Sequence, residues 1–153
     1  CDAARLDRRA RGPGAGGAGP LPPSSVAVTF RPMPTLHSIA IFVTDLERAK
    51  RFYRDDLELT LLREGSFGAE FLEGPTHLGV HPAVHPDSRA LVGRHTGITL
   101  HVSGLLDFCE RLHERGVHFI NEPTRQSFGV MAMIADPDGN VFALWDDRLP
   151  DAH

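Results

Sequence analysis

Residues 38–59 decide the fold, because their sequence SIAIFVTDLERAKRFYRDDLEL has the same pattern as GITLHVSGLLDFCERLHERGVH at residues 97–118. Each copy opens with apolar residues at every second position, which predicts a strand. Thr44 or Ser103 follows and is expected to cap a helix. The apolar stripes of the two predicted helices are Leu46, Ala49, Tyr53 and Leu57 in one copy and Leu105, Phe108, Cys109 and Leu112 in the other. Both halves are therefore predicted to be the same supersecondary unit.

Three further strands are expected after each predicted helix. They are 58–64, 67–72 and 76–82 in the first half and 117–121, 128–135 and 140–146 in the second half, separated by turn residues. The loop 81–95 joins the halves. The pattern predicts an α+β fold made of two βαβββ modules, with helices on one face of each sheet and the other face free.

The first 34 residues differ in composition from the rest of the chain. They are rich in Gly, Pro, Ala and Arg, hold five Arg against two Asp, and show no sustained apolar period. We expect residues 1–34 to be a disordered extension, with natural translation starting at Met33, and we leave open whether residues 1–32 belong to the natural protein. The domain is expected at 35–148, with modules at 36–83 and 96–147 and a tail at 149–153.

Composition narrows the class of protein. The chain has 153 residues and a formal charge of −4, and beyond the extension eleven Lys and Arg stand against eighteen Asp and Glu, which argues against nucleic-acid binding. No apolar run reaches the ~18–20 residues that a membrane helix needs, so no membrane partner is expected. The two cysteines, Cys1 and Cys109, provide neither a disulfide framework nor a cysteine zinc site. A reducing cytoplasm is the expected location.

The closing stretch DPDGNVFALW, residues 136–145, adds a more specific signal. Together with VTDLERAKRFYRDDLEL at 43–59 and the paired modules, it resembles the vicinal oxygen chelate superfamily. That superfamily includes glyoxalase I, extradiol dioxygenases, fosfomycin resistance enzymes, methylmalonyl-CoA epimerase and bleomycin resistance proteins. The resemblance covers 36–147 and implies that the modules form a cup-shaped mixed sheet with helices on its outer face. It also implies a homodimer, and it leaves open whether modules are exchanged between subunits.

The resemblance also places four metal-ligand positions, one on the first and one on the last strand of each module. They fall on Ser38, Gly79, Gly97 and Ala143. A divalent metal needs several His or carboxylate donors at ~2.0–2.2 Å, and Gly and Ala side chains supply none. We therefore expect no cofactor. The alternative is a divalent metal such as Zn, Ni or Fe bound by displaced residues, for which the candidates are His37, His77, His81 and His101.

Period-2 alternation predicts which side chains share the cup with these four positions. The predicted ligand-binding set is Ser38, Phe42, Gly79, His81, Gly97, Thr99, His101, Ala143 and Trp145. Aromatic rings with neutral imidazoles suit an apolar, partly aromatic ligand. Met131 and Met133 are expected to pack in the core. For acid–base chemistry without a metal, His101 and Glu70 are the only candidates.

Three functional hypotheses follow. The first is a non-catalytic small-molecule binder that sequesters an antibiotic-like ligand in a metal-free cup, as the resemblance to bleomycin resistance proteins implies. The second is a metal-dependent lyase, epimerase or dioxygenase with displaced ligands. The third is a regulatory or interaction module whose cup is filled by its own side chains. Whether the chain is an enzyme, and the identity of its ligand, stay open at the level of sequence.

Overall fold

The computed structural model describes residues 16–17, 19–20 and 31–148. The chain divides into two units, Cys1–Met33 and Pro34–His153. Each helix and strand described below belongs to the second unit. The expected disorder of residues 1–34 falls mostly outside the described residues, as does the tail 149–153.

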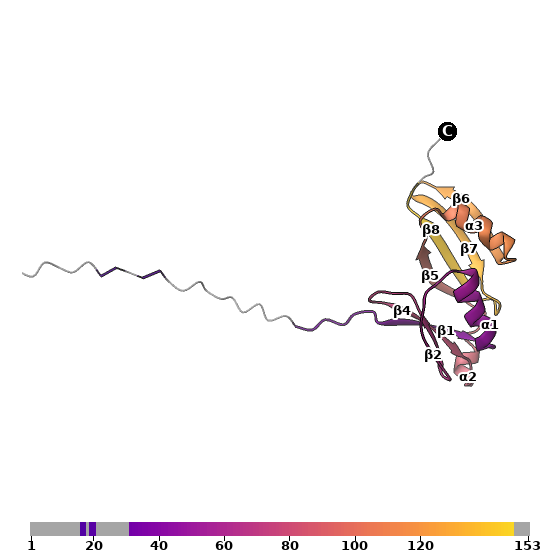
Figure 1. The fold of residues 1–153 in the computed structure, drawn as a ribbon, viewed down its shortest axis with the longest axis horizontal. Coiled ribbons are helices and arrows are strands. Elements are labelled where there is room, and N and C mark those ends of the chain that lie inside the picture. Colours follow the sequence, from indigo (N-terminus) through magenta and orange to yellow (C-terminus); the bar gives the residue numbers. More distant parts are fainter. Residues whose placement is uncertain (1–15, 18, 21–30, 149–153) are drawn as a thin grey trace, which may run out of the picture. The chain divides into compact units, whose positions relative to one another are not determined.

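Each half of the second unit forms one βαβββ module, which confirms the predicted α+β fold (Figure 1). The first module consists of β1 (Ser38–Val43), α1 (Leu46–Arg51), η1 (Phe52–Asp56), β2 (Leu61–Gly65), β3 (Gly68–Phe71) and β4 (His77–Pro82). A short helix, α2 (Pro86–Arg89), lies in the connecting loop. The second module consists of β5 (His95–His101), α3 (Leu105–Glu114), β6 (His118–Gln126), β7 (Gly129–Ala135) and β8 (Val141–Asp146).

The two modules have the same sheet topology. The strand orders are β1-β4-β3-β2 and β5-β8-β7-β6, and in each sheet the first and last strands of the module pair in parallel. The other neighbours are antiparallel. Two bounds differ from the sequence prediction by more than one residue: β6 ends at Gln126 instead of residue 121, and β2 begins only at Leu61, after Glu58 has adopted a left-handed φ of 58°. A turn at Glu58 thus replaces the expected start of the strand.

The helical stripes form the core, as predicted. Ala49, Tyr53 and Leu57 are buried from the first module, as are Leu105, Phe108, Cys109 and Leu112 from α3. In β1 the side chains of Ile41 and Val43 are buried against the helical side. Alternate residues of β1, Ser38 and Phe42, therefore point to the opposite face of the sheet.

The helix caps differ from the sequence prediction. Asp45, rather than Thr44, caps α1 by accepting the backbone N–H of Arg48. The N-cap of α3 is Gly104, in a left-handed conformation with φ of 75°. Its cap is supplied from a distant strand, because the Asp146 carboxylate accepts the N–H groups of Gly104 and Leu105 at 2.7 and 3.2 Å. The expected caps by Thr44 and Ser103 were wrong.

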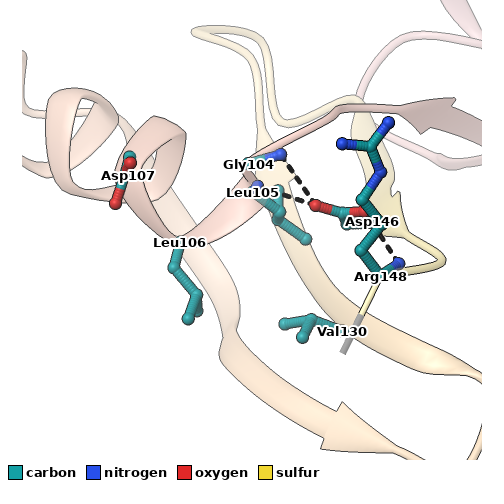
Figure 2. A pocket seen from close by; sticks show the side chains of 7 residues that line it. All are labelled: Gly104, Leu105, Leu106, Asp107, Val130, Asp146 and Arg148. Atoms are coloured by element: carbon teal, nitrogen blue, oxygen red, sulfur yellow. Dashed lines mark hydrogen bonds between the residues drawn. The ribbon is translucent and has the colours of Figure 1, made fainter. Parts of the chain in front are cut away.

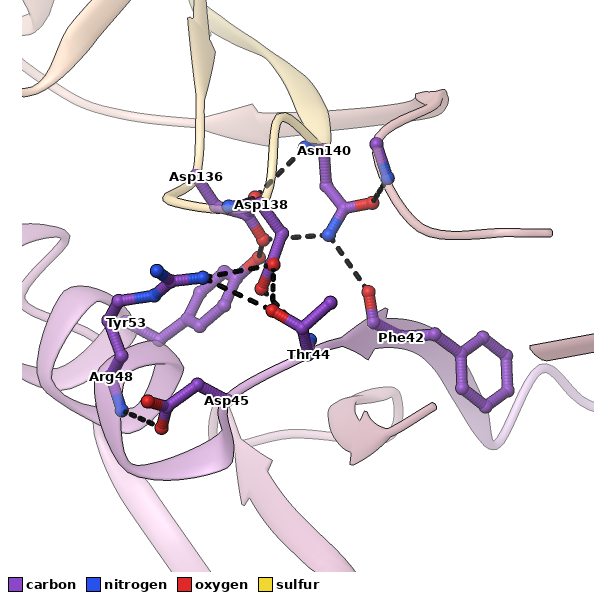
Figure 3. A network of polar contacts seen from close by, with 9 residues as sticks. Phe42, Thr44, Asp45, Arg48, Tyr53, Asp136, Asp138 and Asn140 are labelled. Atoms are coloured by element: carbon purple, nitrogen blue, oxygen red, sulfur yellow. Dashed lines mark hydrogen bonds and ion pairs between the residues drawn. The ribbon is translucent and has the colours of Figure 1, made fainter. Parts of the chain in front are cut away.

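A buried carboxylate, that of Asp136, joins the two modules through the turn before β8 (Figure 3). Its Oδ2 accepts the Tyr53 hydroxyl at 2.6 Å, and its Oδ1 accepts the backbone N–H groups of Asp138 and Asn140. The Asn140 side chain donates to Asp136 and to the carbonyl oxygen of Phe42 at the end of β1. The DPDGN turn is therefore part of the junction between modules as well as the start of the last strand.

Asp138 adds a second set of contacts at this junction (Figure 3). Its side chain is only 5% exposed and accepts the Thr44 hydroxyl at 2.5 Å and the Thr44 backbone N–H at 3.1 Å. Arg48 reaches the same carboxylate at 3.0 Å. Thr44 thus contributes to the contact between modules, which explains why it does not cap α1.

Candidate ligand-binding faces

Each sheet has a face opposite the helix-packed core, which we call its open face. In the first module the open face carries Ser38, Phe42, Glu70, His77, Gly79 and His81, and in the second module Thr99, His101, Met131, Met133, Ala143 and Trp145. The strand register pairs Phe42 with His81 and His101 with Trp145. The predicted cup residues of β1, β4, β5 and β8 thus share these faces, and their role in binding stays a prediction.

The open face of the first module is built around His81. Its imidazole lies 6.2 Å from the Phe42 ring, between centroids, at an interplanar angle of 43°. Its Nδ1 lies 2.8 Å from the carbonyl oxygen of Phe67, in the turn between β2 and β3. Phe67 itself is 88% exposed.

The open face of the second module has the equivalent arrangement. The rings of His101 and Trp145 meet edge to face, with centroids 5.4 Å apart. The indole Nε1–H of Trp145 donates to the carbonyl oxygen of Phe128 at 3.3 Å. Phe128 lies in the turn between β6 and β7 and is 56% exposed. In each module a ring nitrogen on the open face thus meets the backbone carbonyl oxygen of an exposed phenylalanine in a turn.

The two turns share the tripeptide Ser-Phe-Gly, at 66–68 and 127–129. A Cβ on Gly68 would meet the Val80 carbonyl oxygen at 2.5 Å and the His81 Nδ1 at 2.6 Å. A Cβ on Gly129 would collide with the carbonyl group of Asp146. Both glycines therefore let the last strand approach the turn closely. The repeated Ser-Phe-Gly tripeptide could have indicated this close approach, but the sequence prediction did not use it.

Met131 and Met133 lie on the open face, which corrects the expectation that they pack in the core. They pair with Trp145 and Ala143 across β7 and β8 and are partly buried. They line a cavity of about 410 Å³ together with residues of β6, among them Asn121 and Thr124. Ligand pockets commonly measure 300–1,000 Å³. The second module alone therefore offers space for a drug-sized molecule.

The four positions that the resemblance assigns to metal ligands do not fit a metal. Gly79, Gly97 and Ala143 have no donor atom in their side chains, and Ser38 is a poor ligand for a divalent transition metal. The space above Gly79 is taken by the His81 ring, whose Nε2 lies 2.7 Å from where a Cβ would stand. Gly97 lies in an irregular stretch of β5 with φ of 72°. A carboxylate at position 79 would thus require His81 to move.

Other residues of the first module that were considered as metal ligands or catalytic groups already contact neighbouring protein groups. His37 immediately precedes β1, and its ring meets that of His77 edge to face at 5.5 Å. The Nδ1 of His77 lies 3.1 Å from the carbonyl oxygen of Leu72. Glu70 is held by Arg63 at 2.5 Å, and this hydrogen bond lowers the pKa of the Glu70 carboxyl. A carboxylate with a lowered pKa is a weak general base, which counts against Glu70 in acid–base catalysis.

One cluster of His and Asp side chains among the described residues has a spacing that suits a metal: His101, Asp146 and Asp147. Asp146, however, accepts backbone N–H groups from Gly104, Leu105 and Arg148 (Figure 2). These bonds, that from Arg148 foremost, lower the pKa of the Asp146 carboxyl. Its oxygens therefore hold the start of α3, and the adjoining cavity of about 270 Å³ has this cap as its polar wall.

None of the candidate residues that the structure describes is a strong nucleophile. Cys109 is buried in α3, and burial raises the pKa of its thiol to about 11. The thiolate is the reactive form of cysteine, so Cys109 is inert in the folded protein. No helix among the described residues is long and apolar enough to cross a membrane.

Both a sequence relative and solved structures are similar to this chain. The chain is 26% identical over 115 residues to the uncharacterized protein YetH of Bacillus subtilis (strain 168), covering 70% of this chain and 93% of that protein. A member of the glyoxalase/bleomycin resistance protein/dioxygenase superfamily from Sphaerobacter thermophilus DSM 20745 superimposes with a TM-score of 0.67 at 26% identity, covering 74% of this chain and 98% of that one. TnmS3, an antibiotic binding protein from Streptomyces sp. CB03234, superimposes with a TM-score of 0.64 at 29% identity, covering 76% and 98%.

The family model described as Glyoxalase/Bleomycin resistance protein/Dioxygenase superfamily matches residues 35–144. This range contains both βαβββ modules almost entirely. The chain therefore belongs to the glyoxalase/bleomycin resistance protein/dioxygenase superfamily.

Proposed function

We propose that this protein binds and sequesters an aromatic small molecule, without catalysis and without a metal, on the open faces of its two modules. The observation that carries the proposal is the kind of side chain on these faces: the expected metal ligands are replaced, and aromatic rings surround their positions. The positions that the resemblance assigns to metal ligands are occupied by Ser38, Gly79, Gly97 and Ala143. Two pairs of rings share the faces with them, Phe42 with His81 and His101 with Trp145. Apolar walls with a few fixed polar groups are typical of small-molecule sites.

The second module supplies the larger share of the binding surface in this proposal. Its cavity of about 410 Å³ is lined by Met131 and Met133, which adapt readily to the shape of an apolar ligand. Trp145 lies on the same face, opposite Met131. A flat indole can stack on a planar ring system.

The two candidate acid–base residues, Glu70 and His101, favour ligand binding over catalysis. Glu70 is paired with Arg63, and its pKa is lowered. His101 is exposed, and its Nε2 lies 3.1 Å from the Asp147 carboxylate. Nothing among these groups forms a nucleophile with an adjacent base, which covalent catalysis requires.

The name of one similar solved structure supports the ligand class that we propose. TnmS3 is named as an antibiotic binding protein and shares the fold over most of both chains. We therefore propose an antibiotic or a similar aromatic metabolite as the ligand, sequestration as the mode of resistance, and the cytoplasm as the location. We further propose a homodimer, in which a second copy covers the open faces and completes the cup.

A thermal-shift screen of antibiotics and aromatic metabolites tests the proposal, with Trp145 fluorescence as a second readout because it is the chain's single Trp. A true ligand should raise the unfolding midpoint, quench Trp145 and lose affinity in the Trp145→Ala variant. Leu106→Ala, on the helical side of the second module and partly exposed, is the matched control and should bind normally. A ligand that binds Trp145→Ala as tightly as the unaltered protein would place the site elsewhere.

Sedimentation velocity tests the dimer separately. We expect a dimer at micromolar concentration, and we expect added charge on an open face, as in Ala143→Glu, to weaken it. A monomer at all concentrations would remove the dimer from the proposal and leave the ligand-binding part to the screen.

A further inference from the structure

The proton on the His81 ring is fixed by its backbone partner. A carbonyl oxygen can only accept a hydrogen bond, so the Nδ1 of His81, 2.8 Å from the oxygen of Phe67, must be the donor. In the neutral imidazole the other nitrogen, Nε2, then carries a lone pair and no hydrogen. The turn between β2 and β3 therefore sets the tautomer.

The position of the His81 ring is set by two glycines. Added Cβ atoms on Gly68 and Gly79 would stand 2.6 Å from its Nδ1 and 2.7 Å from its Nε2, respectively. The ring thus lies folded along β4, with Nε2 above Gly79. No residue other than glycine at 79 would leave this ring in place.

The Nε2 atom is open to a ligand. Among the described residues no buried side-chain nitrogen or oxygen lacks a hydrogen-bond partner, and the bond to Phe67 uses Nδ1. Nε2 therefore reaches solvent. The His81 side chain lines a cavity of about 190 Å³ together with Phe67, Glu70 and Arg63. The Phe42 ring lies 6.2 Å from the imidazole, between centroids, at an interplanar angle of 43°.

His77, on the same strand, is arranged differently. Its Nδ1 also meets a carbonyl oxygen, that of Leu72, but its ring packs edge to face against His37. The three atoms nearest to an added Cβ on Gly79 all belong to His81. Of the two histidines on β4, it is therefore His81 that places an accepting nitrogen above Gly79, in the middle of this strand.

We propose that the His81 Nε2 is the hydrogen-bond acceptor that selects ligands carrying a hydroxyl or N–H donor on the edge of a planar aromatic ring, with the ring against Phe42. This inference rests on the proposed function and gives it a chemical class, namely phenol-like aromatics. The acceptor is preorganised, because the Phe67 carbonyl holds the tautomer and Gly79 leaves room for the ring. Preorganisation lowers the cost of ordering the site when a ligand binds.

The test compares two probes that differ in the donor alone, 2-naphthol and 2-methoxynaphthalene, by isothermal titration with the full chain at neutral pH. We expect the unaltered protein to prefer 2-naphthol about fivefold, which corresponds to about 1 kcal/mol for one net hydrogen bond. In His81→Phe the preference should vanish while 2-methoxynaphthalene still binds. Gly79→Ala keeps the imidazole and should reduce the preference too, because the methyl group must displace the far end of the ring.

Two further variants test whether the preference for 2-naphthol depends on His81 and not on other histidines. His113→Phe removes an exposed imidazole from α3 and should keep the preference. His77→Phe should keep it as well. Circular dichroism confirms that each variant is folded, and Gly79→Ala provides the test if His81→Phe fails to fold.

The failures of the two proposals are distinguishable. Equal affinity for both probes in the unaltered protein, or a preference that persists in His81→Phe and Gly79→Ala, would overturn the role of His81 and leave an aromatic-binding face intact. If neither probe binds, the role of His81 is overturned in any case, and the screen described above decides whether the binding function falls with it.

Discussion

His81 and Trp145 occupy the same position in the two modules, and the ring nitrogen of each is bonded to the carbonyl oxygen of a phenylalanine in a neighbouring turn. His81 meets Phe67 at 2.8 Å, and Trp145 meets Phe128 at 3.3 Å. The same kind of hydrogen bond, from a ring nitrogen to a backbone carbonyl oxygen of a turn, thus positions a different ring in each module. The first module presents an acceptor nitrogen above Gly79, and the second presents an indole face beside Met131.

The glycines of the two turns should be intolerant of substitution. Gly68→Ala and Gly129→Ala each bring a Cβ against a backbone carbonyl of the last strand, at φ values of 148° and 134°. We expect each to lower the free energy of unfolding by about 2 kcal/mol, within the range for backbone strain. Gly65→Ala, at the end of β2 beside the first of these turns and with open space around it, is the control and should change stability little. Urea denaturation followed by circular dichroism measures all three, and a neutral Gly129→Ala would contradict the packing described for this turn.

Removal of the Tyr53 hydroxyl should weaken the junction between the modules. Burial raises the pKa of Tyr53 well above its usual value, so the hydroxyl stays protonated and donates to Asp136. Tyr53→Phe leaves that buried carboxylate without one donor, at a cost of about 1.5–3 kcal/mol. Arg48→Gln, which breaks a half-exposed bond to Asp138 at the same junction, should cost less than about 1 kcal/mol. Chemical denaturation would refute the role of Tyr53 if the two variants were equally stable.

The cap of α3 predicts a specific dependence of stability on pH. The N–H of Arg148, followed by those of Leu105 and Gly104, holds the pKa of Asp146 below its unfolded value of 3.8. A carboxyl whose pKa is lower in the folded state stabilises the fold above the unfolded pKa and loses this contribution as pH falls through the folded one. The stability difference between the unaltered protein and Asp146→Asn should therefore be constant from pH 7 to about 5 and shrink below about pH 4. A difference that does not change down to pH 3 would exclude Asp146 as a charged cap.

Cys109 should be protected from thiol reagents. Its thiol is buried, and burial raises its pKa to about 11, so little thiolate forms near neutral pH. In a Cys1→Ser variant, which isolates this thiol, modification should be slow and should accelerate in urea. Rapid modification without denaturant would show that α3 opens readily.

The period-2 alternation of the strands allowed the sequence to predict which residues share an open face. Phe42, His81, His101 and Trp145 lie as expected because alternation is a property of each strand alone. The methionines were misplaced, since Val130, Met131, Ala132 and Met133 are all apolar and only the pairing with β8 shows which of them face the core. A continuous apolar run does not encode its own orientation.

Contacts between distant segments account for what the sequence could not predict. Thr44 bonds to Asp138, 94 residues away, and Asp146 caps a helix that begins about forty residues earlier, so neither role follows from local spacing. The position of the His81 ring depends on a carbonyl oxygen of another turn and on the space above Gly79. Such placements require the tertiary structure.

The most direct test of the central claim, that the open faces bind an aromatic molecule without a metal, is a titration of the strongest ligand from the screen into chelator-treated protein. The titration is repeated after addition of Ni²⁺, Zn²⁺ or Fe²⁺, with metal content measured in parallel. We predict the same dissociation constant with and without metal, and no stoichiometric metal in the purified protein. Binding that depends on metal, together with a stoichiometric metal that is lost in His81→Ala or His101→Ala, would contradict the account.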